Sequence, residues 1–203
     1  MGYEVSERVA EIKVRLEAFM EEHVYPREHD WNEFTLNQDN LWQTPDWFDE
    51  LRELAKAEGL WNLFLPLEYE PWSPGLTNVE IAPLFEVMSK VIWAQAVFNC
   101  NAPDRGNMEV LAKYGTEEQQ EQWLKPLLAG EIRSAYAMTE PQVASSDATN
   151  MELEIKRDGD EILACISNPI GRSIPILKPK RKNFEKHRPL ASYFKHPLKK
   201  VYK

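Results

Sequence analysis

The first apolar pattern of the chain runs through its N-terminal twenty residues. Val5, Val9, Ile12, Leu16 and Phe19 recur at steps of four, three, four and three, and charged residues separate them. An α-helix has 3.6 residues per turn, so this spacing places all five side chains on one face. The pattern predicts an amphipathic helix of roughly twenty residues at the start of the chain.

A second helix is predicted after residue 43. Thr44 is followed by proline and aspartate, which is typical of an N-cap and a first helical turn. Trp47, Leu51 and Leu54 then share one face, and Gly59 ends the pattern. The sequence therefore predicts a helix whose buried face carries these three apolar side chains.

Capping signals extend the helical pattern to residue 130. Thr77–Glu80 and Thr116–Gln119 both fit the capping box, in which the first and fourth side chains satisfy each other's backbone N–H groups. A short helix is predicted to begin at Asp104, to run through Met108 and Leu111, and to end near Gly115. Residues 1–130 are thus predicted to form an all-helical domain, with one long irregular stretch at Pro66–Gly75.

The periodicity changes from helical to alternating in residues 131–165. Ile132–Met138 holds small and β-compatible residues, and apolar and charged residues alternate through Met151–Lys156. Asp158-Gly159 is a hairpin signal, and Ile162-Leu163 begins a return strand. A two-stranded ribbon alone is marginally stable in water. We therefore predict a mainly α chain whose last ordered part is the start of an incomplete β-domain.

Charge separates the last 38 residues from the rest of the chain. Residues 166–203 hold 11 of the 24 Lys and Arg residues and one of the 33 Asp and Glu residues, so their net charge is +10 and that of the remainder is −19. Prolines interrupt every candidate element there, and disorder is expected. The segment is either a solvated basic arm for an anionic surface or sequence that does not belong to the fold.

Composition and cysteine usage exclude several classes. Hydrophobic residues make up 43% of the chain, which is enough for a core, but no window approaches the ~18 apolar residues of a membrane span. The N-terminal residues lack the apolar block of a signal peptide, and their acids argue against a transit peptide. Cys100 and Cys165 show no metal spacing and are expected to be free thiols. His23 and His29 have no visible ligand partner, so no metal site is predicted.

Residues 134–150, "SAYAMTEPQVASSDATN", are small, polar and rich in hydroxyl groups. "YGTEEQ" and "WLKPLLAGE" precede "AMTEP" and "SSD", and "GL" and "LPLE" lie further upstream in the helical part. The order of these motifs resembles the acyl-CoA dehydrogenase family over residues 1 to about 162, and most closely the branch with family members 10 and 11.

The resemblance implies an FAD site in this segment. It places Tyr136, Met138 and Thr139 along the isoalloxazine and allows the backbone at Ala137 a close approach. It implies that a serine before the aspartate contacts a phosphate or the CoA part of the substrate; Ser145 and Ser146 are both candidates for the cofactor, and Ser146 for the substrate. Taken alone, Thr-Glu-Pro is a turn and Ser-Ser-Asp a loop or cap. The side chains of Trp61, Trp72 and Trp93 are expected in the core rather than as a substrate platform.

The resemblance also divides the chain into three parts. Residues 1–130 match the family's N-terminal helical domain, residues 131–165 match the start of its middle β-domain, and residues 166–203 are unrelated to it. In the family a C-terminal helical domain supplies the catalytic glutamate and most subunit contacts. No catalytic residue is therefore assigned. The acids Glu68, Glu70 and Glu140 are the candidates for a substitute base. The expectation is a truncated product of splicing or a shifted frame, inactive alone.

Three classes of function remain open. The chain is a flavin-dependent acyl-CoA dehydrogenase domain that is active only at full length, a binding module for full-length subunits, or a helical scaffold whose basic tail binds anions. The family implies an acyl-CoA substrate, a homo-oligomer at full length, and a mitochondrial or peroxisomal location. No nucleic-acid partner and no membrane span are expected.

Overall fold

The computed structural model of the protein describes residues 6–40, 43–135, 143, 147–150, 152, 154–158 and 161–165. It separates into two compact units, residues 1–135 and residues 136–203, and each is described by itself. The first unit is helical, and the second contains a two-stranded antiparallel sheet.

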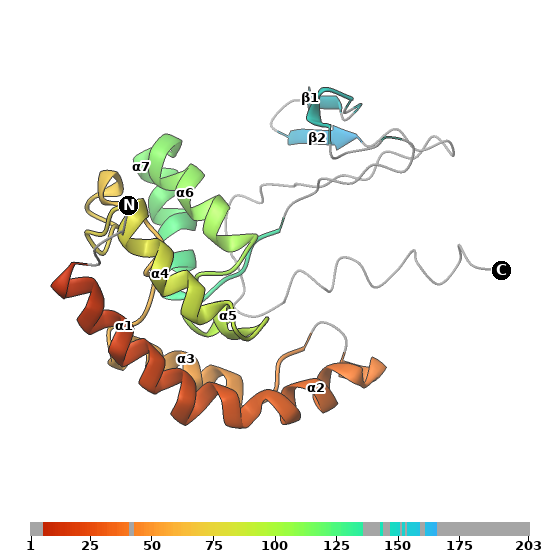
Figure 1. The fold of residues 1–203 in the computed structure, drawn as a ribbon. Coiled ribbons are helices and arrows are strands. Elements are labelled where there is room, and N and C mark those ends of the chain that lie inside the picture. Colours follow the sequence, from red (N-terminus) through yellow and green to blue (C-terminus); the bar gives the residue numbers. More distant parts are fainter. Residues whose placement is uncertain are drawn as a thin grey trace. The chain divides into compact units, whose positions relative to one another are not determined.

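One nearly continuous helical run opens the first unit. Helix α1 (Glu7–Phe19) continues through a π turn, η1 (Met20–Val24), and a 3₁₀ turn, η2 (Tyr25–Arg27), into α2 (Glu28–Leu36) (Figure 1). The Ser6 hydroxyl caps α1 by accepting from the backbone N–H of Val9. The predicted stripe is confirmed for its described members, which are all buried: Val9, Ile12, Leu16 and Phe19.

Two π turns in this unit each precede a proline. In η1 the Tyr25 N–H donates to the carbonyl of Met20, and Pro26 follows. In η5 (Gln120–Leu124) the Lys125 N–H donates to the carbonyl of Gln120, and Pro126 follows. Proline has no N–H, and its ring collides with the carbonyl four residues earlier in a regular α-helix. The wider turn relieves that collision and lets the helical path continue.

Helix α3 (Trp47–Ala57) differs from its predicted start and face. Its N-cap is Asp46, so the prediction that Thr44 caps the helix is wrong. The helix therefore starts two residues later than predicted, and its first turn is closed by the Phe48 N–H, which donates to the carbonyl of Pro45 at 3.0 Å. The buried residues are Phe48, Leu51 and Ala55, whereas Leu54 is 42% exposed. Leu51 is buried and Trp47 is partly buried against the core as predicted, whereas Leu54 is exposed and Phe48 and Ala55 are buried in addition.

Helix α4 (Asn78–Met88) begins at the predicted capping box. The Thr77 side chain accepts from the Glu80 N–H, and the Glu80 carboxylate accepts from the Thr77 N–H at 2.9 Å. The pKa of Glu80 lies below its ordinary value, chiefly because of this backbone N–H and then because of the Thr77 and Ser6 hydroxyls. The 3₁₀ turn η4 (Leu67–Tyr69) lies in the predicted irregular stretch.

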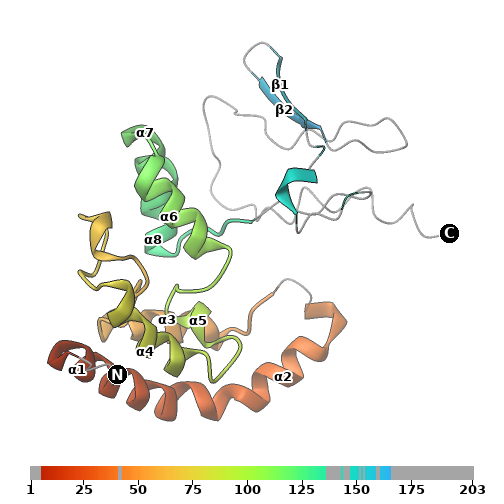
Figure 2. The same cartoon turned by 45° about the horizontal axis from the view of Figure 1, so that its top comes forward.

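The remaining helices of the unit are short. They are α5 (Ala94–Val97), α6 (Asp104–Tyr114), α7 (Glu117–Gln119) and α8 (Lys125–Ala129), with η5 between the last two. Helix α6 has the predicted bounds, and the capping box at Thr116 is confirmed. Helices α1 and α4 contact each other, as do α3 and α5, and α6 and α8 (Figure 2).

One hydrophobic core joins these helices. Phe19, Phe64 and Phe98 are among its largest fully buried side chains. Trp93 is buried, and Trp61 and Trp72 are partly buried and packed against the core, which agrees with the predicted packing role. Cys100 is a free, buried thiol as predicted, and burial raises its pKa to about 12.

The second unit contains the predicted hairpin. Strands β1 (Glu154–Asp158) and β2 (Glu161–Cys165) pair antiparallel, and Asp158 lies opposite Glu161. A 3₁₀ turn, η6 (Ala148–Asn150), precedes them. The Asp147 carboxylate accepts from the Thr149 hydroxyl at 2.6 Å and from its backbone N–H at 3.0 Å, which lowers the pKa of Asp147. Residues 166–203, the predicted basic tail, lie outside the described residues.

Candidate functional site

The end of α8 is fixed by side chains from two distant loops. The Trp61 indole N–H and the Asn62 amide both donate to the carbonyl of Leu128, at 2.7 and 2.9 Å. The Asn99 amide donates to the carbonyl of Leu127 at 3.0 Å. The last carbonyls of a helix have no partner within it, so these bonds satisfy groups that would otherwise stay unpaired. They fix the point from which the chain leaves α8.

The chain then turns in a left-handed conformation and crosses to α6. Gly130 has φ +73°, and no strand is assigned to residues 131–135, so the predicted strand does not begin at Ile132. The segment is held instead by the side chain of Asp104, the first residue of α6. Asp104 Oδ1 accepts from the backbone N–H and the hydroxyl of Ser134, both at 2.6 Å. Its Oδ2 accepts from Arg133 Nε at 2.5 Å.

The Asp104 carboxylate is buried and fully engaged. The residue is 1% exposed, and a buried charge is tolerated only when it is paired and hydrogen-bonded. Arg133 supplies the opposite charge, and the position at the start of α6 suits an acid because the helix dipole is positive there. Asn107, one turn later, donates to the Ser134 hydroxyl at 2.8 Å. Two residues of one helix therefore hold one serine.

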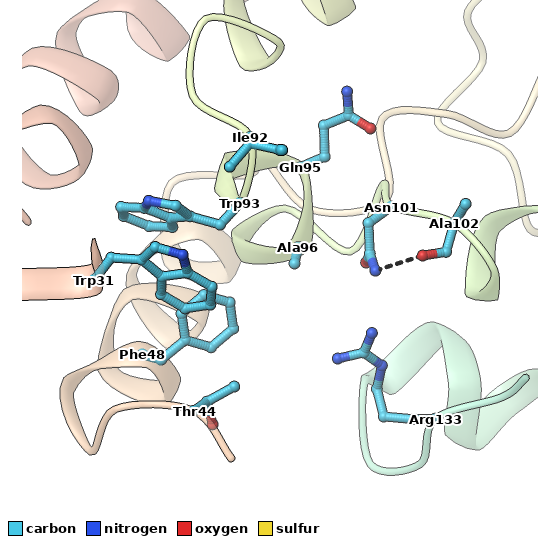
Figure 3. A pocket seen from close by; sticks show the side chains of 10 residues that line it. All are labelled: Trp31, Thr44, Phe48, Ile92, Trp93, Gln95, Ala96, Asn101, Ala102 and Arg133. Atoms are coloured by element: carbon cyan, nitrogen blue, oxygen red, sulfur yellow. Dashed lines mark hydrogen bonds between the residues drawn. The ribbon is translucent and has the colours of Figure 1, made fainter. Parts of the chain in front are cut away.

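An open pocket of about 430 Å³ lies beside this anchor. Figure 3 shows aromatic side chains gathered on one side of it and the guanidinium of Arg133 on the other, pointing towards Asn101. The lining residues are Trp31, Thr44, Phe48, Ile92, Trp93, Gln95, Ala96, Asn101, Ala102 and Arg133. The pocket thus combines an apolar wall with amide and guanidinium donors, which suits an amphipathic ligand.

The apolar wall is a set of packed rings. Trp31 stacks on Trp93 with ring centroids 5.0 Å apart and an interplanar angle of 21°, and Trp31 lies 5.5 Å from Phe48. Ile92 is 94% exposed at the edge of this wall. Offset stacking of this kind stabilises the rings in a fixed orientation.

No lining residue of this pocket is an acid. Glu68 and Glu70, which were considered as substitute bases, are exposed and do not line it. A hollow of about 610 Å³ over α3 is lined only by exposed residues of that helix, Asp49, Glu50, Glu53 and Leu54, and does not enclose a ligand. Among the described residues no group of three or more His, Cys, Asp or Glu side chains could hold a metal ion. None of the described helices is both long and apolar enough to span a membrane.

The residues predicted to bind the flavin lie outside the described residues. These are Tyr136, Ala137, Met138, Thr139, Ser145 and Ser146, and Glu140 lies outside them as well. The anchor formed by Asp104 and Ser134 ends two residues before this segment begins. The sequence predicts Asp104 only as a helix start and does not predict its contacts with Arg133 and Ser134. A contact across 30 residues leaves no periodic signal in a single sequence.

The comparisons with known proteins agree with this architecture. The family model for the acyl-CoA dehydrogenase N-terminal domain matches residues 6–131, more than half of the chain. The chain belongs to the acyl-CoA dehydrogenase family. The matched residues end at Glu131, three residues before the anchored Ser134.

Individual relatives cover about three quarters of this chain. Mouse acyl-CoA dehydrogenase family member 10 is 52% identical over 157 residues, which are 76% of this chain and 15% of the mouse protein. Rat acyl-CoA dehydrogenase family member 11 is 50% identical over 157 residues, again 76% of this chain, and 20% of the rat protein. The resemblance to the branch with members 10 and 11 is confirmed. The chain therefore spans at most about a fifth of these relatives.

A solved structure also shares the fold. A Mycobacterium abscessus protein assigned to the acyl-CoA dehydrogenases superposes with a TM-score of 0.72 and is 46% identical. The superposition covers 80% of this chain and 42% of the solved chain. The fold class predicted from the sequence is thus confirmed: a mainly α chain with the acyl-CoA dehydrogenase N-terminal domain.

Proposed function

We propose that this chain contributes one side of the active site of a flavin-dependent acyl-CoA dehydrogenase, an enzyme that removes hydrogen from the α and β carbons of an acyl-CoA thioester. The observation that carries the proposal is the Asp104 anchor. It holds Arg133 and Ser134, and the anchored backbone leads directly into the proposed flavin-contacting segment Tyr136–Thr139. Residues 1–130 would act as the family's N-terminal helical domain and residues 131–165 as the start of its middle domain.

The pocket supports an acyl-CoA as the substrate. An acyl chain needs an apolar wall, and the partly buried Trp31 and the exposed Ile92 present one. The buried rings of Phe48 and Trp93 pack behind Trp31. A thioester carbonyl needs hydrogen-bond donors, and the side chain of Arg133, half of which is exposed, points across the opposite side of the pocket (Figure 3). The same pocket therefore meets both demands of the substrate.

FAD is the cofactor that the family implies, and the described residues are compatible with it. The ring carbonyls of a flavin accept hydrogen bonds, and the side-chain amides of Gln95 and Asn101 carry N–H donors at the pocket. Tyr136, Ala137, Met138 and Thr139 would hold the ring, and Ser145 and Ser146 would contact a phosphate. When bound, the flavin supplies the hydride acceptor, while the protein binds and orients the substrate.

A general base is the element that the described pocket lacks. Proton abstraction needs a carboxylate within hydrogen-bond reach of the α-carbon proton, and no lining residue of the pocket is an acid. The one buried acid nearby, Asp104, is engaged by Arg133 and Ser134. We therefore propose that the 203-residue chain alone does not reduce flavin with acyl-CoA.

Anaerobic mixing with FAD and acyl-CoA tests this proposal. The purified chain, excess FAD and a panel of short to very long acyl-CoAs are mixed, and flavin bleaching is followed by absorbance. Tryptophan fluorescence is recorded in parallel, because Trp31 and Trp93 line the pocket. We expect saturable quenching by acyl-CoA and no bleaching. Absence of quenching by any acyl-CoA would contradict substrate binding, and bleaching abolished by Glu68→Gln or Glu70→Gln would contradict the absence of a base.

Two further properties follow from the family rather than from the chain itself. We propose an oligomer at full length and a mitochondrial or peroxisomal location. Fluorescence microscopy of a tagged protein in cells, with markers for both organelles, tests the location. A uniform signal that overlaps neither marker would contradict it.

A further inference from the structure

The guanidinium of Arg133 is held at one nitrogen and available at the other two. Its Nε donates to Asp104 Oδ2, and Asp104 is 1% exposed. The same carboxylate accepts from the backbone N–H and the hydroxyl of Ser134, so three donors share its negative charge. Among the described residues, no hydrogen bond occupies the two Nη groups of Arg133. The guanidinium therefore has a fixed place and keeps donors for another acceptor.

These Nη groups face the pocket beside the anchor. Figure 3 shows the guanidinium directed into this hollow of about 430 Å³, on the side opposite the aromatic rings. The side chain is 50% exposed, so a ligand can reach it from solvent. Arg133 is the one charged residue among the described residues that line the pocket. The volume lies within the range of about 300–1,000 Å³ of small-molecule sites.

The other polar groups at the pocket are neutral and partly engaged. The Gln95 amide donates to the Ser89 hydroxyl at 3.0 Å, and the Asn101 amide donates to the carbonyl of Ala102 at 3.0 Å. Hydrogen bonds to an ionised group are roughly twice as strong as those between neutral groups. Arg133 therefore decides which polar end the pocket prefers. A planar guanidinium matches the two oxygens of a carboxylate, whereas a hydroxyl or a carbonyl presents only one.

The apolar side of the pocket suits a hydrocarbon chain. Ile92 is 94% exposed, and Trp31 is partly buried. An apolar side chain in contact with water is unfavourable, and a hydrocarbon chain that covered Ile92 would remove this contact. The ligand that meets both sides of the pocket has an anionic head and an apolar tail.

We propose that the pocket binds a free fatty carboxylate, with the carboxylate on the two Nη groups of Arg133 and the hydrocarbon chain along Trp31 and Ile92. The inference goes beyond the proposed function, because it needs neither a flavin nor CoA and uses residues of the first unit alone. Asp104 is a positioning residue for Arg133 in this account. A carboxylate bound here would compete with the acyl-CoA of the proposed function, because both would occupy the same apolar wall.

A series of ligands with one chain length tests the preference for a carboxylate. Octanoate, octanol and octylamine are titrated into the 203-residue protein, and isothermal titration calorimetry gives each Kd. We expect octanoate to bind at least about tenfold more tightly than octanol, which is the effect of one hydrogen bond to a charged group. Octylamine should not bind, because its charge repels Arg133. Octanoate that binds no more tightly than octanol would overturn the proposal.

Magnetic resonance locates the bound ligand in the same samples. The indole N–H signal of Trp31 in isotope-labelled protein, assigned by its loss in Trp31→Phe, should shift on addition of octanoate. An unchanged Trp31 signal at saturating octanoate would place the ligand elsewhere and overturn the proposed site.

Three substitutions separate the head group from the chain. Arg133→Met should weaken octanoate at least about tenfold and leave octanol unchanged, so that the preference disappears. Ile92→Ser should weaken octanoate and octanol by the same factor, because both chains lie on the apolar wall. Lys90→Met is the control, since it removes the same charge from an exposed residue that does not line the pocket. It should bind both ligands as wild type does.

The outcomes decide this inference and the proposed function separately. An unchanged preference in Arg133→Met overturns the inference. If Arg133→Met does not fold because Asp104 loses its opposite charge, Arg133→Lys replaces it, since lysine keeps the charge but not the planar pair of donors. Octanoyl-CoA is titrated in parallel. If octanoyl-CoA binds and octanoate shows no preference, the inference alone fails, whereas the reverse result overturns only the acyl-CoA part of the proposed function.

Discussion

The side-chain amide of Asn99 donates to the side-chain oxygen of Asn62 at 2.7 Å, and both residues have left-handed backbones, with φ of 55° and 58°. Asparagine tolerates this conformation better than other residues with a β-carbon. The same Asn99 amide also binds the carbonyl of Leu127. The pair therefore joins two loops to the end of α8.

Replacement of Asn99 should lower the free energy of unfolding in two separable parts. Asn99→Ala loses both hydrogen bonds and strains the backbone, at a cost of about 2–4 kcal/mol. Asn99→Gly loses the same bonds but keeps the backbone relaxed, so its cost should be smaller by about 1 kcal/mol. Urea unfolding followed by tryptophan fluorescence measures both. An alanine variant as stable as wild type would contradict the role of this pair.

Gly130 should tolerate a side chain less well than Gly59. Both have left-handed φ, +73° and +67°, so an alanine at either costs about 1–2 kcal/mol. At Gly130 the new β-carbon would also lie 2.7 Å from Trp61 Cζ2 and press on the Arg52 guanidinium, whereas at Gly59 the nearest atom, Arg15 Nη1, is 3.9 Å away. In thermal unfolding, Gly130→Ala should have a lower melting temperature than Gly59→Ala. Equal melting temperatures would show that the Trp61 side chain can shift away from the new β-carbon without loss of stability.

A fall in pH should destabilise the start of α4, because Glu80 becomes protonated. The Thr77 backbone N–H holds the pKa of Glu80 below its ordinary value, so the charged form stabilises the folded state. That contribution is complete above the unfolded pKa of about 4.3 and is lost as the pH falls through the lower folded pKa. Between about pH 5 and 3, unfolding free energy should therefore fall more steeply in wild type than in Glu80→Gln.

A substitution on the same helix provides the control for this pH effect. Glu86 is exposed on α4, and Glu86→Gln should leave the pH dependence as in wild type. The measurement is urea unfolding at a series of pH values. If the free energy of unfolding of wild type and Glu80→Gln depended on pH in the same way, the capping box would make no contribution to the acid sensitivity.

Cys100 should resist alkylation until the protein unfolds. Burial raises the pKa of its thiol to about 12, so the reactive thiolate is scarce at pH 8, and the side chain is 1% exposed. Cys165→Ser isolates this thiol, and peptide mass spectrometry after iodoacetamide treatment measures its labelling. We expect labelling in denaturant and very little without it. Rapid labelling of the folded protein would show that this part of the core opens readily.

Local patterns predicted most of the helical unit, because their signals lie within a few residues of each other. The Thr77 and Thr116 capping boxes and the stripe from Val9 to Phe19 are of this kind. The start of α3 was misplaced because Thr44 offers a cap signal, while the first hydrogen bond of the helix forms at Pro45. Tertiary packing there buries Phe48 and Ala55 and leaves Leu54 exposed, which the local pattern did not predict.

The candidate site was predictable only in part, since its described contacts join distant residues. The motif around Tyr136 pointed to a flavin because it resembles a family, and no spacing pattern led to it. The pair of Asp104 and Ser134 is separated by 30 residues, and that of Asn62 and Asn99 by 37. Such pairs depend on how the helices pack, and a single sequence does not encode that in any local period.

The two π turns also fix the angular phase of the helices that follow them. Successive residues of an α-helix are about 100° apart around its axis, so one residue more or fewer turns everything downstream by that angle. Trp31 lies downstream of η1 and stacks on Trp93 at 5.0 Å. Loss of a single residue from Met20–Val24 would rotate Trp31 away from Trp93 and open the apolar wall of the pocket, although every residue that lines it would still be present.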